Sequence, residues 1–164
     1  MNNNLDRPFY YLENFAFVLD WVRLRYGDLL DNEEAGFIAR FAALPDVSRA
    51  LLVRMVMRKG GLFRTSKLRY EEIGDIATAM RALVEAGWVE VDPELALEQL
   101  YGLLTRQEFA DALGFHAAKA ARKGDLYEMA MQGEATPRRF SAWCVALADC
   151  AVAVVSCSSP CKLR

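Results

Sequence analysis

The sequence predicts a mainly α-helical fold that contains a winged helix-turn-helix-like core with a small β-hairpin. Apolar residues recur at helical spacing along most of the chain. Between residues 46 and 93 the expected elements follow in the order helix, strand, helix, helix, strand, which is the order of a winged helix. Of the 164 residues, 54% are hydrophobic, which is enough to bury a core.

Residues 1–45 are expected to form an N-terminal helical segment with two helices. The first follows the segment Asp6–Pro8, which has the character of a cap and a first turn. Its apolar residues recur every three or four positions, at Tyr11, Phe15, Val18, Val22 and Tyr26. The second helix opens with a capping box, because Asp31 precedes Glu34 by three residues, and Pro45 ends it.

Residues 46–93 are expected to form the winged-helix-like, DNA-binding core. The expected elements are a helix from Asp46 to the Gly60-Gly61 pair, an extended segment Leu62–Arg64, a short helix around Tyr70–Gly74, a longer helix Ile76–Ala86 and a strand Trp88–Val91. The longer helix takes the second-helix position of the motif. The two extended segments are expected to pair in a small sheet.

Residues 94–133 are expected to form a further helical segment. Leucines recur at helical spacing at its start, at Leu97, Leu100, Leu103 and Leu104. Thr105 and Glu108 then form another capping box, and two short helices are expected over Thr105–Leu113 and Lys123–Met131. Residues 134–164 show no usable periodicity, and we expect an atypical tail that is disordered or truncated.

Positive charge is concentrated in one stretch of a chain that is slightly acidic as a whole. The formal net charge is −2, so attraction to a polyanion has to come from local segregation of charge. From Arg49 to Tyr70 the sequence carries seven Lys or Arg residues and no Asp or Glu. A solvated basic face and a phosphate-contacting surface both agree with this run, and the pattern alone does not choose between them.

A phosphate-contacting surface needs cations spaced along a DNA backbone. Arg54 and Arg58 lie one helical turn apart, and Lys59 follows at the helix end. On the helix Ile76–Ala86 only Arg81 suits bidentate contact with base edges, so we expect recognition of backbone and shape instead of sequence. A basic loop near residue 120 adds further cations. The candidate DNA-binding residues are Arg54, Arg58, Lys59, Arg64, Lys67, Arg81, Lys119, Arg122 and Lys123.

Other candidate sites have simpler explanations. His116 has no Cys or second His near it in sequence, so we expect a loop residue and no ligand or base. Glu71, Glu72 and Asp75 suit a helix N-terminus, where acidic residues are favoured, better than a metal site. The four cysteines all fall in the last 21 residues and lack the Cys-x-x-Cys spacing of zinc sites. We therefore expect neither a catalytic residue nor a bound metal here.

The sequence shows no targeting or membrane segment. Its first residues lack the basic and apolar regions of a signal peptide. The apolar run 145–155 is interrupted by Asp149 and is shorter than the roughly 20 residues that cross a bilayer. We expect a cytoplasmic protein without a membrane partner, and homo-oligomerisation stays open.

Several separated blocks carry a family resemblance. They are Tyr10–Phe15, Val18–Val22, Ser48–Gly60, Lys67–Ile73 and Ala86–Val89. In this order they resemble the N-terminal region of the Fanconi-associated nuclease family, whose members carry a VRR-NUC catalytic domain. The resemblance is strongest to the bacterial members. The resemblance runs from about Tyr10 to about Trp143. It implies a winged-helix-like portion followed by a SAP-type portion, so residues 94–133 are expected to be SAP-like.

The resemblance also implies particular contacts. Arg58 and Lys59 look similar to an Arg-Lys pair that the family uses at the DNA backbone. The segments Leu104–Phe109 and Arg122–Leu126 look similar to its SAP helices. The family activity is metal-dependent 5′-flap endonuclease and 5′-to-3′ exonuclease cleavage of the phosphodiesterase I type, used in repair of interstrand crosslinks. Mg²⁺ or Mn²⁺ is implied for the full-length family.

The sequence departs from the family in two respects. The VRR-NUC domain needs a Glu-x-Lys element to hold metal and orient water, and no Glu-x-Lys occurs in the 164 residues. Beyond Trp143-Cys144 the sequence stops resembling the family, as a frame-shifted or prematurely ended reading would. We therefore expect a DNA-binding portion of a structure-selective repair nuclease, without the catalytic domain and inactive alone. Its expected partner is branched or 5′-flap DNA.

Two other functions agree with the pattern. One is a small winged-helix transcription regulator that dimerises through the helix near Tyr10–Leu30 and binds duplex DNA. The other is a winged-helix protein-interaction module whose basic strip faces an acidic partner. Binding to a flap, a nicked duplex and a plain duplex of scrambled sequence separates the three, because only the nuclease portion is expected to prefer the flap.

Overall fold

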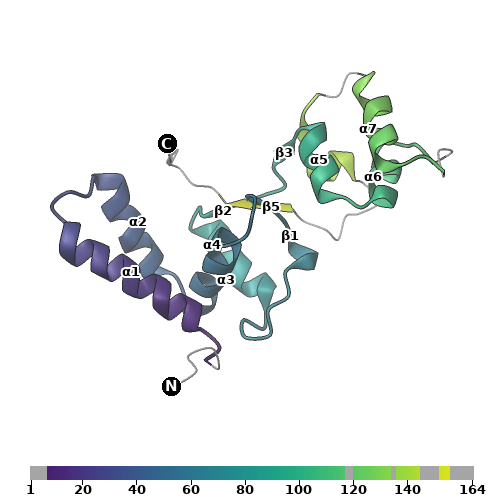
Figure 1. Cartoon of the computed structure of the whole chain (residues 1–164). Coiled ribbons are helices and arrows are strands. Elements are labelled where there is room, and N and C mark those ends of the chain that lie inside the picture. The colour runs from purple at the N-terminus through teal and green to yellow at the C-terminus, as the bar shows by residue number, and fades with distance from the viewer. Residues whose placement is uncertain (1–6, 117–119, 134–135, 145–151, 156–164) are drawn as a thin grey trace. The chain divides into compact units, whose positions relative to one another are not determined.

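The computed structural model describes residues 7–116, 120–133, 136–144 and 152–155. The chain divides into two compact units (Figure 1). Among the described residues, the first unit comprises 7–61, 69–89 and 155, and the second comprises 62–68 and those from 90 to 154. Both units are mainly helical, as expected from the sequence. None of the described helices is long and apolar enough to cross a membrane.

The first unit is built around a central helix. Its helices are α1 (Tyr10–Tyr26), α2 (Asn32–Ala43), α3 (Asp46–Val56) and α4 (Ile76–Glu85). Helix α1 packs against α2 and α3, and α3 packs against α4 (Figure 1). Most side chains of α3 are buried, among them Ala50, Leu51, Leu52, Val53 and Met55. Burial of this apolar helix against its neighbours stabilises the unit.

The helix starts of this unit follow the motifs that the sequence contains. The Asp31 side chain accepts hydrogen bonds from the backbone N–H groups of Glu33 and Glu34, and Glu34 accepts one from the Asp31 N–H in return. This is the expected capping box of α2. Pro45 stands between α2 and α3, and Asp75 caps α4 through the N–H groups of the following turn.

One expected helix is absent among the described residues. We expect a short helix around Tyr70–Gly74, but this segment forms a single hydrogen-bonded turn, in which Ile73 and Gly74 both donate to the Tyr70 carbonyl. Gly74 has a φ of 69°, which ends helical geometry, and the capping residue of α4 follows at once. A short 3-10 helix lies earlier, at Thr65–Lys67.

The second unit is a small helical unit with a paired edge. Its elements are β3 (Glu94–Leu95), α5 (Leu97–Leu103), α6 (Arg106–Ala112), α7 (Lys123–Met131), β4 (Arg138–Arg139) and α8 (Phe140–Trp143). The capping box of Thr105 and Glu108 opens α6 as expected. The most deeply buried side chains of its core are Leu95, Leu100, Phe109 and Leu126. Trp143 closes this core, because its indole Nε1 donates to the Leu95 carbonyl at 3.1 Å.

The strand pairing differs from the expected hairpin. A three-stranded sheet has the order β1 (Leu62–Arg64), β5 (Val152–Val155), β2 (Val89–Val91). Strands β1 and β2 belong to one small sheet, as expected, but β5 lies between them and pairs antiparallel with β1. Strand β4 pairs antiparallel with β3, with Arg139 opposite Glu94. The expected lack of regular structure after residue 133 is thus wrong for β4, α8 and β5.

Candidate nucleic-acid interface

The structure divides the nine candidate cations into two classes. Three of them, Arg54, Arg64 and Lys123, form hydrogen bonds or ion pairs with other residues of the chain. Five of them lie exposed, namely Arg58, Lys59, Lys67, Arg81 and Arg122. Lys119 lies outside the described residues. A cation that is already bonded to protein groups has fewer donors to offer a phosphate, so this division decides which residues form the candidate interface.

Arg54 belongs to a polar cluster of the first unit. Its guanidinium donates to Glu72 Oε1 from Nε at 3.0 Å and from Nη2 at 2.6 Å, and it lies 4.0 Å from the ring centroid of Tyr11. The Tyr11 hydroxyl donates to the same Glu72 oxygen at 3.2 Å. Burial raises the pKa of Glu72, but the hydrogen bonds from Arg54, the backbone and Tyr11, together with the charge of Arg54, outweigh it and lower the pKa overall. Arg54 therefore joins α3 to α1 and to the turn before α4.

Arg64 forms the most buried ion pair in the part of the chain that the structure describes. Its side chain is 5% exposed, and Nη1 lies 2.8 Å from both carboxylate oxygens of Glu108. Burial raises the pKa of Glu108, but the backbone N–H of Thr105 and the guanidinium of Arg64 outweigh it and lower that pKa to about 2. This pair joins β1 to the start of α6 within the second unit.

Lys123 caps a helix end in the second unit. Its ammonium donates to the Leu104 carbonyl at 2.7 Å and also to the Tyr101 carbonyl, both at the end of α5. It lies 4.2 Å from the ring centroid of Tyr101. Burial lowers the pKa of Lys123. The cation thus satisfies carbonyl groups that a helix C-terminus leaves without partners.

Arg58 and Lys59 are the exposed cations of the first unit that stand next to each other. They follow the last turn of α3, and Gly60, with a φ of 91°, turns the chain away after them. The Arg58 guanidinium lies 5.7 Å from the ring centroid of Tyr70. No described carboxylate forms an ion pair with Arg58 or Lys59. Their charges are available to an external anion.

Helix α4 offers little for reading bases. Arg81 is exposed on it. Thr78 is also exposed, but its hydroxyl is engaged in the helix cap, where it donates to Asp75 Oδ2 at 2.5 Å. This hydrogen bond lowers the pKa of Asp75. Most other exposed residues of α4 are alanine, valine or glutamate. The helix therefore presents one side chain suited to bidentate base contact, which favours contact with the backbone.

The candidate list leaves out one exposed cation of the same basic stretch. Arg69 lies in the first unit next to Tyr70, with an exposed side chain. A count of Lys and Arg over the stretch includes it, so the signal was present in the sequence. In the second unit, Arg138 and Arg139 on β4 are also exposed, and they sit in a segment for which the sequence predicts no regular structure.

The structure also places the acidic cluster before α4 and His116. Glu72 is bonded to Arg54 and Tyr11, and Asp75 caps α4, so the helix-terminus reading of this acidic cluster is confirmed for Asp75. His116 is 72% exposed, with Nδ1 at 3.4 Å from Asp111 Oδ1. Among the described residues no three His, Cys, Asp or Glu side chains are grouped as metal ligands.

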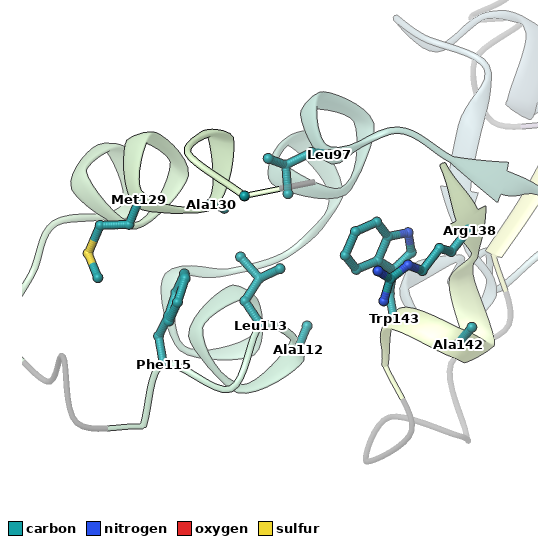
Figure 2. Close-up of a pocket in the computed structure, with 10 residues that line it drawn as sticks. Leu97, Ala112, Leu113, Phe115, Met129, Ala130, Arg138, Ala142 and Trp143 are labelled. Carbon is teal, nitrogen blue, oxygen red and sulfur yellow. The ribbon is translucent and has the colours of Figure 1, made fainter. Parts of the chain in front are cut away.

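The second unit also contains an open pocket of about 360 Å³ (Figure 2). Side chains from α5, α6, α7 and α8 form its walls, and nearly all of them are apolar, such as Leu113 and Met129. Phe115 and Trp143 are its aromatic residues, and the guanidinium of Arg138 lies 4.9 Å from the Trp143 ring centroid. A pocket with one cation and apolar walls lacks the donors that hold a DNA backbone. Its lining includes none of the nine candidate DNA-binding residues.

Two family models match this chain. The model described as "FAN1, HTH domain" matches residues 9–90, and the model described as "Fanconi anemia-associated nuclease SAP domain" matches residues 94–143. Together they cover both structural units. The first match includes α3 and the turn after it, where Arg58 and Lys59 lie, and the second includes the helices around the pocket.

Individual proteins agree with these matches. The chain is 50% identical over 140 residues to the Fanconi-associated nuclease 1 homolog of Pseudomonas aeruginosa, which is 85% of this chain and 25% of that protein. It is 34% identical over 112 residues to human Fanconi-associated nuclease 1, which is 65% of this chain and 11% of that protein. The chain therefore spans about a quarter or less of the length of these relatives.

Solved structures extend the agreement to three dimensions. The crystal structure of paFAN1 bound to 2nt 5′ flap DNA with gap superposes with a TM-score of 0.84 and 47% sequence identity, covering 93% of this chain and 28% of that one. The complex with a 1nt 5′ flap gives a TM-score of 0.83. From these matches of sequence and fold we conclude that the chain belongs to the Fanconi-associated nuclease family and contains its HTH and SAP region.

Proposed function

We propose that this chain binds the backbone of branched DNA, with a 5′ flap as the preferred form, as the DNA-binding portion of a repair nuclease. The observation that carries the proposal is the pair Arg58 and Lys59, which is exposed and has no carboxylate partner among the described residues. The pair lies in the region matched by the HTH family model, and the similar paFAN1 structures hold 5′-flap DNA.

The chemistry of this pair fits phosphate better than bases. Two adjacent cations at a helix end displace condensed counterions when they meet phosphates, which gives affinity that falls with salt and does not depend on sequence. Arg81 adds a third cation to the first unit, while Lys67 and Arg122 are the exposed candidates of the second. Arg54, Arg64 and Lys123 stabilise the fold, so we leave them out of the proposed interface.

The family activity enters this proposal through the longer relatives. We propose that a full-length protein containing this region cleaves 5′ flaps with Mg²⁺ or Mn²⁺ in repair of DNA crosslinks, and that the 164 residues supply DNA binding to that reaction. The chain has no Glu-x-Lys element, so the pure chain incubated with either metal and a labelled flap is expected to give no product. Reproducible cutting would show that it contains an active site of its own.

The test is fluorescence anisotropy with a labelled 5′ flap, a nicked duplex and a plain duplex of the same scrambled sequence. We expect the flap to bind most tightly and all three affinities to fall steeply with salt between two concentrations. Equal binding of all three DNAs would contradict the proposed preference for a 5′ flap. Absence of salt-dependent binding to any of them would remove DNA binding itself.

A second candidate function has one observation in its favour. Helix α1 exposes large apolar side chains, with Phe17 71% exposed and Leu24 79% exposed. Exposed apolar side chains of this kind suit a protein contact, as in a winged-helix regulator that dimerises through this helix. Sedimentation of the chain with a duplex library tests it: a dimer that binds one palindrome tightly supports the regulator, and a monomer that prefers flaps supports the nuclease portion.

A further inference from the structure

Tyr70 connects the buried polar cluster of the first unit with the exposed cation Arg58. Its ring centroid lies 5.4 Å from the Arg54 guanidinium and 5.7 Å from that of Arg58. Arg54 is itself fixed, because it makes two hydrogen bonds to Glu72 and lies over Tyr11. A continuous series of contacts therefore leads from α1 through Arg54 and Tyr70 to Arg58.

The cluster treats its two arginines differently. Glu72 neutralises Arg54, so the ring of Tyr70 has only one uncompensated cation beside it. Arg58 has no ion-pair partner in the part of the chain that the structure describes. A ring face attracts a guanidinium without consuming its N–H donors, which point outward in the guanidinium plane. A carboxylate at the same place would occupy two of those donors. The cation–π contact with Tyr70 therefore holds Arg58 and leaves its donors for a phosphate.

The backbone around Arg58 explains why a side-chain support matters. Helix α3 ends at Val56, and the Arg58 N–H donates to the Met55 carbonyl in the turn that follows. Lys59 follows, and then the two glycines Gly60 and Gly61. Met57 and Lys59, on either side of Arg58, are themselves exposed, so neither is packed in a way that restricts the Arg58 side chain, which has many rotamers to lose on binding.

We propose that Tyr70 is a positioning residue for DNA binding, because its ring holds the Arg58 guanidinium ready for a phosphate. This inference rests on the proposed role of Arg58 in DNA binding. A side chain that is ordered before binding loses less conformational entropy in the complex, so the ring raises affinity without touching DNA. The Tyr70 hydroxyl is buried and has no hydrogen-bond partner among the described residues, so the ring alone carries the effect.

The test is a double-mutant cycle in the whole 164-residue chain, read by anisotropy with the 5′ flap at two salt concentrations. The variants are Tyr70→Leu, Tyr70→Phe, Arg58→Ala and the combination of Tyr70→Leu with Arg58→Ala. Tyr26→Leu is the matched control, since Tyr26 is an exposed tyrosine of the same unit that packs edge-to-face against Trp21 and lies over no cation among the described residues. Thermal unfolding of every variant reports its stability.

We expect Tyr70→Leu to weaken flap binding about two- to fivefold, which is the range of a cation–π contact at a surface. Tyr70→Phe and Tyr26→Leu are expected to bind like the unmodified chain. In the Arg58→Ala background, Tyr70→Leu is expected to cause no further loss, because a positioning residue acts only through the residue that it positions.

Three outcomes overturn parts of this reasoning, and they are distinguishable. If Tyr70→Leu weakens binding equally in both backgrounds, Tyr70 has a general structural role and the inference fails. If Arg58→Ala weakens binding but Tyr70→Leu does not, the inference fails and the proposed function stands. If Arg58→Ala binds the flap as tightly as the unmodified chain, the proposed role of Arg58 fails, and the positioning role fails with it.

Discussion

Removing the negative charge of Glu108 tests whether Arg64 belongs to the fold or to the DNA interface. Glu108→Gln keeps an oxygen that can accept the Thr105 backbone N–H, now bonded at 2.7 Å, but it leaves the Arg64 guanidinium without its carboxylate. Arg64 is 5% exposed, so water cannot replace the lost partner. Removing one charge of a buried ion pair is strongly destabilising.

The size of the effect follows from the pKa of Glu108. A fall from 4.5 in the unfolded chain to about 2 in the fold corresponds to about 3 kcal/mol at neutral pH. Because Gln retains the hydrogen bond from Thr105 in a weaker form, we expect Glu108→Gln to lower the free energy of unfolding by about 2–3 kcal/mol. Flap affinity at a temperature where both chains are folded is expected to stay unchanged.

The assay is urea unfolding followed by circular dichroism at pH 7, with Asp125→Asn as matched control. Asp125 also accepts a backbone N–H at the start of its helix, from Arg122 at 2.9 Å, but no described cation forms an ion pair with it. The control is expected to cost well under half as much as Glu108→Gln. Equal losses for the two variants, or a midpoint for Glu108→Gln like that of the unmodified chain, would refute a structural ion pair.

Three further outcomes are expected. Because the pKa of Glu108 is depressed, the stability that it contributes is present above pH 4.5 and is lost as the pH falls towards 2. The difference in unfolding free energy between the unmodified chain and Glu108→Gln should therefore shrink by about 2 kcal/mol between pH 7 and pH 3, and a constant difference in urea titrations would contradict this. Asp31→Ala removes the cap of α2 and should cost about 1 kcal/mol of unfolding free energy, whereas Asp31→Asn should cost much less; equal losses would argue against capping. Lys123→Met should lower the free energy of unfolding by about 1–3 kcal/mol, because the Tyr101 and Leu104 carbonyls lose their donor. Flap affinity should stay unchanged. Weaker DNA binding under conditions where the variant is fully folded would show that Lys123 belongs to the DNA interface.

Local hydrogen bonds made much of the fold predictable from sequence. The capping boxes at Asp31 and Thr105 satisfy backbone N–H groups within three residues, so the pattern alone places the starts of α2 and α6. Strand pairing depends on residues far apart in sequence. Val154 lies opposite Leu62 although more than 90 residues separate them, and nothing near β1 in sequence indicates such a partner.

The candidate interface was predictable in its location but not in its membership. Arg54 and Arg58 are the same residue type one turn apart, so the sequence pattern predicts the same DNA-binding role for both. Glu72, 18 residues further on, neutralises only Arg54, and that choice is made by packing of the turn before α4 against α3. Arg64 and Lys123 likewise find partners across the second unit. Charge patterns therefore locate a basic surface, while the fold decides which of its cations remain available.

The central claim is that Arg58 and Lys59 bind DNA phosphates, and its most direct test is charge reversal read through the salt dependence of binding. Arg58→Glu combined with Lys59→Glu is compared with Arg23→Glu combined with Arg25→Glu, which makes the same change of charge at exposed positions on α1 of the same unit. The expected result is a large loss of flap affinity for the first variant. The slope of log affinity against log salt should also become shallower, by roughly 0.9 for each of the two phosphate contacts that are lost. The control is expected to keep its slope. Equal slopes in both variants and the unmodified chain would contradict the claim.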